Sequence, residues 1–256
     1  MMRANFLKLL YPLAGIAIIL IAWHLYVVLL RVPTVVLPGP LQVSAATTTH
    51  AKILLEESWV TTLECIYGFA LALGLGIPIA VVMTYSRVTN LMFYPLLVAS
   101  QSIPKVAVAP ILLVWFGTGI ESKLAMAFVI AFFPIVVDTA TGLRSTSPEL
   151  LELARSLQCS RLQTFFKIQL PSALPSIFSG AKIAVTLAVI GAVIGEFIGS
   201  NEGLGNLLLT ANSQLNTPLA WAALVVLSVL GMILYGAVVL AERIMMPWAP
   251  DGAHKL

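Results

Sequence analysis

The residues of this chain best suited to chemistry are ionisable groups placed inside or at the ends of long apolar runs. They are Glu64, Lys105, Asp138 and Glu196. Such a group is costly to hold in apolar surroundings, so it usually lines a polar cavity or pairs with another group. Lys105 has the strongest case, because its run is broken by polar residues and prolines: Ser100, Gln101, Ser102, Pro104 and Pro110. The pattern predicts a cation that lines a cavity; a lysine that stretches to the edge of the run is the alternative.

Glu196 opens a second polar segment, in which Ser200 and Asn201 lie among several glycines. This carboxylate either borders a solute path or caps the junction of two helices. Asp138 lies about two helical turns before Arg144, and we interpret it as a carboxylate that supports helix packing.

No arrangement of residues predicts an enzyme. The sequence has no Gly-rich phosphate loop ending in Lys-Ser or Lys-Thr, and no H-E-x-x-H, C-x-x-C or G-x-S-x-G motif. Cys65 and Cys159 lack the spacing of a metal site, and the three histidines are far apart. We therefore predict no catalytic residue, no metal site and no cofactor bound by this chain.

The longest polar interval between apolar runs, residues 147–171, predicts a helix, a turn and a second helix. Ser147 is a suitable N-cap, with Pro148 and Glu149 in the first turn. An apolar stripe then recurs at helical spacing: Leu150, Leu153, Ala154 and Leu157. Glu152 and Arg155 lie off this stripe and can pair. Ser160 and Gln163 have the spacing of a capping box, and Pro171 is expected to end the second helix.

This interval resembles the cytoplasmic loop of binding-protein-dependent ABC importer permeases. Glu152-Leu153-Ala154 stands at the E-A-A of the family pattern, and Ile168-Gln169-Leu170-Pro171 closes it at the expected distance. Leu153 replaces the central alanine, and Gln158 replaces a glycine. Because glycine there allows a left-handed helix stop, glutamine in the same conformation costs about 1 kcal/mol.

The resemblance covers most of the chain and favours the nitrate/sulfonate/taurine-type branch. The matching segments are residues 37–40 (LPGP), 103–105 (IPK), 115–117 (WFG), 195–201 (GEFIGSN) and 203–205 (GLG). It implies a type I importer permease whose loop couples it to a separate ATPase through Glu152, Leu153, Ala154, Arg155, Leu157 and Gln158. It also implies two ATPase subunits that bind ATP and Mg²⁺, an extracytoplasmic substrate-binding protein, and a second copy of the permease.

The composition agrees with a membrane protein. The chain of 256 residues is 59% hydrophobic and 10% charged, with a mean hydropathy of +0.99, whereas soluble domains carry about 25% charged residues. Its apolar runs predict an all-α polytopic fold with six transmembrane helices, at residues 9–30, 59–83, 91–116, 123–143, 176–198 and 219–240. We read residues 1–256 as one permease domain with a cytoplasmic coupling loop at 144–175. The first run is read as a retained span rather than a cleaved signal.

The basic residues predict the orientation of these spans. With the N-terminus inside, nine of them lie in the cytoplasm: Arg3, Lys8, Arg87, Arg144, Arg155, Arg161, Lys167, Arg243 and Lys255. Only Arg31, Lys52 and Lys123 then lie outside, in accord with the positive-inside rule. We expect the chain to lie in the inner membrane of a bacterium, with both termini in the cytoplasm. The net charge of +3 does not favour nucleic acid.

We therefore predict a permease subunit that moves a small solute inward at the expense of ATP hydrolysed elsewhere. The solute is a nitrate-, sulfonate- or taurine-like anion or a small heterocyclic vitamin precursor. Its path is expected along Ser100, Gln101, Ser102, Lys105, Glu196, Ser200 and Asn201. The alternative is an ion-coupled secondary transporter or channel that uses Lys105, Asp138 and Glu196.

Overall fold

The computed structural model describes the backbone of residues 2–248 and the side chains of residues 10–248. Helices account for the regular structure of this part of the chain, and it has no strand. They are α1 (Met2–Leu29), α2 (Pro40–Thr49), α3 (Ala51–Tyr85), α4 (Arg87–Ser100), α5 (Ala109–Phe116), α6 (Ile120–Arg144), α7 (Pro148–Ser156), α8 (Arg161–Thr164), α9 (Leu170–Gly199), α10 (Leu204–Ser213) and α11 (Thr217–Met245). The all-α prediction is confirmed.

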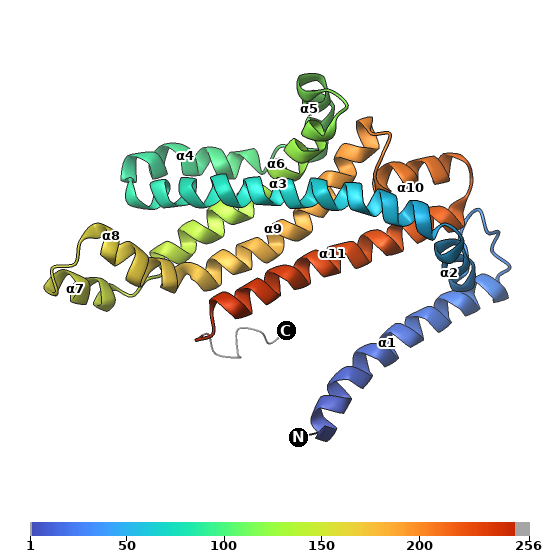
Figure 1. Ribbon diagram of the computed structural model, residues 1–256, viewed down its shortest axis with the longest axis horizontal. Helices are drawn as coiled ribbons and strands as arrows, with labels where there is room; N and C mark the ends of the chain where they lie inside the picture. The colour runs from blue at the N-terminus through green and yellow to red at the C-terminus, as the bar shows by residue number, and fades with distance from the viewer. Residues whose placement is uncertain (1, 249–256) are drawn as a thin grey trace.

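Three long helices, α3, α6 and α9, run side by side and form the centre of the molecule (Figure 1). Their contacts are lined by small residues, which let helix backbones approach closely in a membrane. A Cβ added to Gly191 of α9 would lie 2.6 Å from the Cα of Ala127 in α6. A Cβ on Gly68 of α3 would lie 2.5 Å from the Cβ of the same alanine. Ala127 is thus the meeting point of the three helices.

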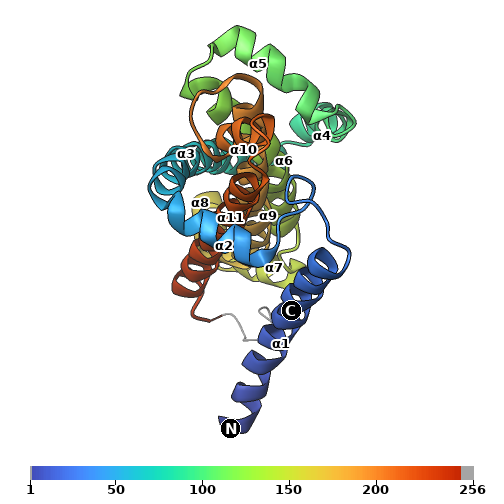
Figure 2. The ribbon, with the colours of Figure 1, turned by 90° about the vertical axis from the view of Figure 1, so that its right-hand side faces the viewer.

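Two helices lie beside this core. Helix α11 packs along α9, whereas α1 slants away from the body (Figures 1 and 2). The ring of Trp23 in α1 meets that of Trp221 in α11, with 5.2 Å between centroids. Most other described side chains of α1 are exposed, as expected for an apolar helix that lipid surrounds.

The third apolar run is broken, as its prolines and polar residues predict. Helix α4 stops at Ser100, and a short 3₁₀ turn (Lys105–Val108) leads into α5 after a bend of 94°. The described residues therefore contain five helices long and apolar enough to cross a membrane, and six crossing elements if the bent pair counts as one.

Two predicted boundaries are wrong. Helix α3 begins at Ala51 rather than near residue 59, so Ile53, Leu54 and Leu55 belong to it. Pro171 does not end a helix, because α8 runs through a π-helical turn (Phe165–Gln169) directly into α9. The amide of Leu170 bonds to the carbonyl of Phe165, five residues back. This wider turn lets the chain admit a proline, which lacks an N–H, without a break.

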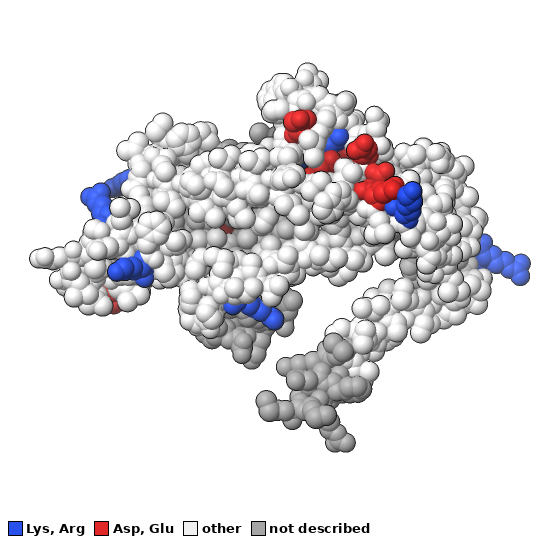
Figure 3. Space-filling view, viewed as in Figure 1, with Lys and Arg blue, Asp and Glu red and all other residues white. Residues whose placement is uncertain are grey.

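Acidic side chains are less spread over the visible face than basic ones. Acidic atoms gather where α3, α5 and α10 approach one another, whereas basic atoms appear both at the end that carries α7 and α8 and at the opposite end (Figure 3). Lys123, which the charge count placed outside, is only 5% exposed, and its ammonium donates to the carbonyl of Thr118 at 2.8 Å. Lys182 pairs with Glu242 of α11 at 3.0 Å. The side chains of Arg3 and Lys8, and all of Lys255, lie outside the described residues.

Candidate functional site

The loop between α6 and α9 begins with a well-capped helix. The Ser147 hydroxyl accepts a hydrogen bond from the amide of Leu150 at 3.3 Å, which confirms Ser147 as the N-cap of α7. Hydrogen bonds from its own amide and from Ser147 hold the pKa of the Glu149 carboxyl below its usual value. A carboxylate in the first turn also suits the positive end of the helix dipole.

The apolar stripe of α7 divides into an exposed part and a buried part. Leu150, Leu153 and Leu157 are 43%, 54% and 68% exposed, whereas Ala154 is only 2% exposed. Ala154 therefore packs inward, unlike the three leucines of the predicted stripe. The three leucines form an apolar ridge along one face of α7 and its C-cap. We call them the leucine ridge.

Helix α7 ends in the left-handed turn that the family pattern reserves for glycine. Gln158 has φ = +53°, a region that costs a residue with a Cβ. The amide of Gln158 bonds to the carbonyl of Arg155 at 2.9 Å, and that of Cys159 to Ala154 at 3.0 Å. These two bonds are those of a Schellman motif. The turn keeps its geometry despite the substitution.

The second helix of the loop starts as the sequence predicts. Ser160 and Gln163 form a reciprocal capping box, with N···O distances of 3.2 and 2.9 Å. By contrast, Glu152 and Arg155 form no ion pair among the residues that the structure describes, so that expected pair is not made. Arg155 instead lines a polar pocket with Arg161 on α8.

A second polar assembly lies at the opposite end of the core, around Glu196. One Glu196 oxygen accepts from the Thr61 hydroxyl at 2.6 Å, and the other accepts from the amide of Gly205 at 2.5 Å. The Thr61 oxygen in turn accepts from the amide of Leu204 at 2.9 Å. Thr61 and Glu196 are at most 1% exposed. The carboxylate therefore holds the start of α10 against α3 and α9.

Two acidic residues on α3 extend this assembly. Glu57, Thr61 and Glu64 recur at helical spacing, so they share the face of α3 that meets α10. Glu57 accepts the amide of Gly203, while Glu64 contacts Glu196 and has one buried oxygen without a partner. The side chains of α3 and α9 thus accept hydrogen bonds from three amides at the start of α10, those of Gly203, Leu204 and Gly205. These amides have no partner within α10, so the side-chain oxygens cap the helix.

The close approach of this backbone to Glu196 requires glycine at positions 203 and 205. Gly203 has φ = +98°, and a Cβ there would lie 2.1 Å from a Glu196 oxygen. A Cβ on Gly205 would lie 2.6 Å from the other oxygen. No other residue type allows the backbone to come this near the carboxylate.

The bent span places its polar residues at the surface. Ser100, Gln101 and Ser102 are exposed at the break, and Lys105 is half-buried with its ammonium 5.9 Å from the Phe133 ring centroid. Helix α5 then reaches the junction that follows Glu196, where a Cβ on Gly199 would lie 2.3 Å from Leu113. Ser200 is half-buried beside this contact, and Asn201 is exposed. The two predicted path segments are therefore joined through α5, although Glu196 itself is buried.

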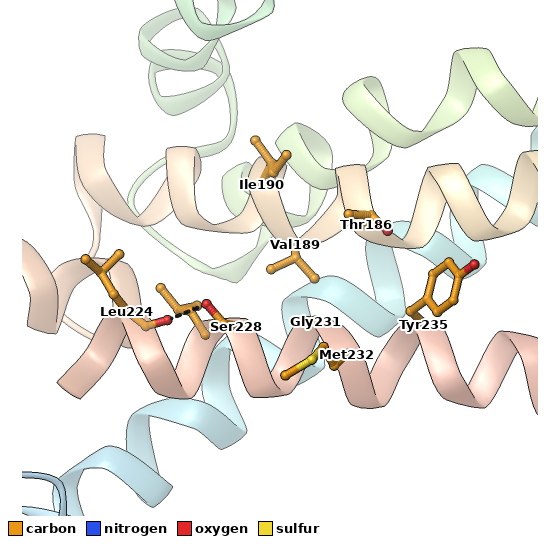
Figure 4. A pocket seen from close by; sticks show the side chains of 9 residues that line it. Thr186, Val189, Ile190, Leu224, Ser228, Gly231, Met232 and Tyr235 are labelled. Atoms are coloured by element: carbon orange, nitrogen blue, oxygen red, sulfur yellow. Dashed lines mark hydrogen bonds between the residues drawn. The ribbon is translucent and has the colours of Figure 1, made fainter. Parts of the chain in front are cut away.

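A groove of about 450 Å³ runs between α9 and α11 (Figure 4). Apolar side chains such as Val189, Ile190 and Leu224 dominate its wall. Two of its hydroxyls bond within their own helices: Thr186 donates to the carbonyl of Lys182 and Ser228 to that of Leu224. The groove therefore presents a mainly apolar surface that suits lipid acyl chains.

Comparison with protein families identifies the architecture. Residues 72–246 match the family described as "Binding-protein-dependent transport system inner membrane component". The chain belongs to this family. It is an ABC importer permease and a transport component of the membrane, as the resemblance in its loop predicts.

Curated relatives cover nearly the whole permease. A probable ABC transporter permease protein of Haemophilus influenzae is 38% identical over 90% of this chain and 94% of its own length. The formylaminopyrimidine transport permease protein ThiX of Halalkalibacterium halodurans is 38% identical over 93% and 95%. A chain of the inward-facing MetNI methionine ABC transporter has a TM-score of 0.65 at 21% identity, over 77% of this chain and 97% of that chain. This last likeness confirms the type I importer fold.

Two residues of the assembly around Glu196 were not predicted from the sequence. Thr61 and Glu57 each belong to a run that is otherwise apolar or exposed, so neither was assigned a role. The spacing of Glu57, Thr61 and Glu64 was the available signal, since polar residues on one face of a span need a partner.

Proposed function

We propose that this permease works as a homodimer bound to two ATPase subunits, and that the leucine ridge of α7 seats in a groove of one ATPase. ATP and Mg²⁺ are bound by those partners and not by this chain. An extracytoplasmic binding protein delivers the solute to the end of the molecule that carries α10. Both termini and the coupling loop lie in the cytoplasm.

The exposed leucine ridge carries this proposal. Three leucines on a short helix leave apolar surface in water, and an amphipathic helix usually buries such a face in a hydrophobic groove. The Schellman turn and the capping box hold α7 rigid relative to α8. Because α8 continues into α9, motion of a docked α7 passes directly to a central span.

The docking role is tested by placing a charge on the ridge. Leu153→Glu and Leu157→Glu should each reduce co-purification of the ATPase with the permease by about tenfold or more, since central apolar anchors dominate such contacts. Ser156→Glu is the matched control, because Ser156 is exposed on the same helix and outside the ridge. Equal ATPase recovery with all three variants would exclude docking through the ridge.

We further propose that the bent span and the outer junction line the solute path at the two-fold interface. Ser100, Gln101, Ser102 and Lys105 contribute from the break, and Ser200 and Asn201 from the junction. Polar residues at this depth need water or protein around them, because lipid cannot satisfy them. Glu196 supports the junction from behind.

Lys105 offers a test of this path. If its charge assists an anion, Lys105→Met should reduce uptake in reconstituted vesicles, whereas Lys105→Arg should retain most of it. Phe133→Leu removes the ring beneath the ammonium and should cost less than loss of the charge. Equal uptake by the Met and Arg variants would show that the charge of Lys105 has no role in transport.

The cargo is proposed as a small anion or a small heterocycle. Relatives of this permease are named for formylaminopyrimidine, riboflavin, aliphatic sulfonates, taurine and bicarbonate. The binding protein that co-purifies with the complex should therefore gain thermal stability from one of these compounds or from nitrate. The ion-coupled alternative loses support, because Lys105, Asp138 and Glu196 make no contact with one another among the described side chains.

A further inference from the structure

A polar pocket of about 530 Å³ lies behind α7, between the coupling loop and the end of α3. Its wall contains Tyr85 of α3, Leu151 and Arg155 of α7, Arg161 and Thr164 of α8, and Gln169. This volume falls within the range of roughly 300–1,000 Å³ that is typical of small-molecule sites.

The pocket offers hydrogen-bond donors and no anion. Arg155 and Arg161 form no ion pair or side-chain hydrogen bond with any residue that the structure describes, and no acidic side chain lines the wall. The Gln169 carbonyl oxygen accepts from the Tyr85 hydroxyl, which leaves the Gln169 amide group as a donor. Two arginines in the wall of one cavity suit a phosphate, which each guanidinium group can bind through two N–H groups.

The pocket is separate from the face proposed for ATPase docking. Arg155 follows Leu153 by two residues, so the two side chains leave α7 about 200° apart. Arg155 and the half-buried Leu151 thus lie on the side of α7 away from the leucine ridge. Tyr85 ends a membrane-crossing helix, which places the pocket near the level of the inner phospholipid headgroups. Anionic headgroups concentrate near basic residues on that side of a membrane.

The geometry points to a binding site for a phosphate group between Arg155 and Arg161. The phosphate belongs either to an anionic phospholipid of the inner leaflet or to a free phosphorylated solute. In both cases it bridges α7 to α8, which connects the coupling loop to α9. Occupancy therefore stiffens the loop at the point where motion enters the span. This site needs neither the proposed docking nor the proposed path, and only its phospholipid source rests on the proposed orientation.

The test uses the full-length permease in discs of phosphatidylcholine, with thermal unfolding as the readout. Adding sodium pyrophosphate at constant ionic strength should raise the unfolding midpoint if the source is a solute. Replacing part of the lipid by phosphatidylglycerol should raise it if the source is a headgroup. Arg161→Gln should abolish whichever rise in the unfolding midpoint the wild type shows, and it should weaken pyrophosphate affinity by about tenfold or more. Lys167→Gln is the control, because it removes the same charge from the same loop outside the pocket.

A second variant guards against a folding defect in Arg161→Gln. Thr164→Glu keeps both arginines and adds a carboxylate to the wall, so it should also abolish the shift, while the unliganded protein stays folded. A shift that is equal in wild type, Arg161→Gln and Thr164→Glu, or the absence of any shift with either probe, would overturn the proposal. If the unfolding midpoint rises only when the ATPase subunit is added to the discs, and not with either phosphate probe, the arginines belong to the ATPase contact and the phosphate site is rejected.

Discussion

Gln158 has a left-handed backbone conformation, in which any side chain with a Cβ lowers the stability of the fold. Its φ of +53° puts the Cβ near the backbone, yet two Schellman bonds hold the turn in place. Gln158→Gly should therefore stabilise the permease by about 1 kcal/mol, which corresponds to a rise of about 2–4 °C in the unfolding midpoint. Thermal unfolding of the purified protein measures this change.

The control for that prediction is Gln163→Gly in the same loop. Gln163 lies inside α8 with helical geometry and closes the capping box, so glycine there should lower the midpoint. If both glycine variants shifted the midpoint in the same direction, the left-handed turn would not be the cause.

Thr61 is the residue on which the assembly around Glu196 depends. Its hydroxyl donates to Glu196 and accepts from the amide of Leu204, all within a fully buried site. Thr61→Val keeps the shape but strands that amide, at a cost of about 1–3 kcal/mol in unfolding free energy. Hydrogen exchange should show faster exchange of the amides at the start of α10.

Thr62→Val provides the comparison for Thr61→Val. Thr62 is the next residue of α3, and its hydroxyl bonds only to the carbonyl of Ser58 in its own helix, at 2.6 Å. Its loss should leave exchange at residues 203–205 unchanged. Faster exchange in both variants would mean that the start of α10 does not depend on the Thr61 bridge.

At the scale of helices, close approach depends on a few small residues in α3, α6 and α9. Gly191→Ala would place a Cβ 2.6 Å from the Cα of Ala127 and 2.9 Å from the carbonyl of Met126. Because backbone atoms cannot rotate away, the helices must separate, and such overpacking costs about 1–3 kcal/mol. The variant should unfold at lower temperature.

Gly231→Ala in α11 is the matched substitution for Gly191→Ala. A Cβ at Gly231 meets no atom within 4 Å, so the change should be neutral or slightly stabilising through helix propensity. Comparable destabilisation by both alanines would show that α6 and α9 do not pack as described.

For the whole molecule, the testable property is its orientation in the membrane. In a Cys65→Ala/Cys159→Ser background, a cysteine at Thr48 should react with a membrane-impermeant maleimide in intact cells, and one at Ser156 should not. Both positions are exposed, so accessibility reports the side of the membrane. The positive-inside rule supplies the physical reason. Labelling at Ser156 and protection at Thr48 would invert the proposed topology.

Local chemistry was sufficient to predict much of this permease. The caps at Ser147 and Ser160, the break after Ser100 and the apolar spans each depend on residues a few positions apart, so the sequence shows them directly. Gln158 is different, because it replaces the glycine of the family pattern and so left the geometry of that turn open; the structure shows that the left-handed turn is kept.

Other features were decided only when distant segments came together. Thr61 and Glu196 are 135 positions apart, and nothing near either residue specifies the other. Their bond, the burial of Lys123 and the inward side of Ala154 depend on how α3, α6, α9 and the loop pack. The continuity of α8 with α9 also escaped prediction, because a π-helical turn accommodated the proline that was expected to end the helix. Hydrogen bonds within one helical turn follow from sequence order, whereas contacts across the core are selected by packing all the helices at once.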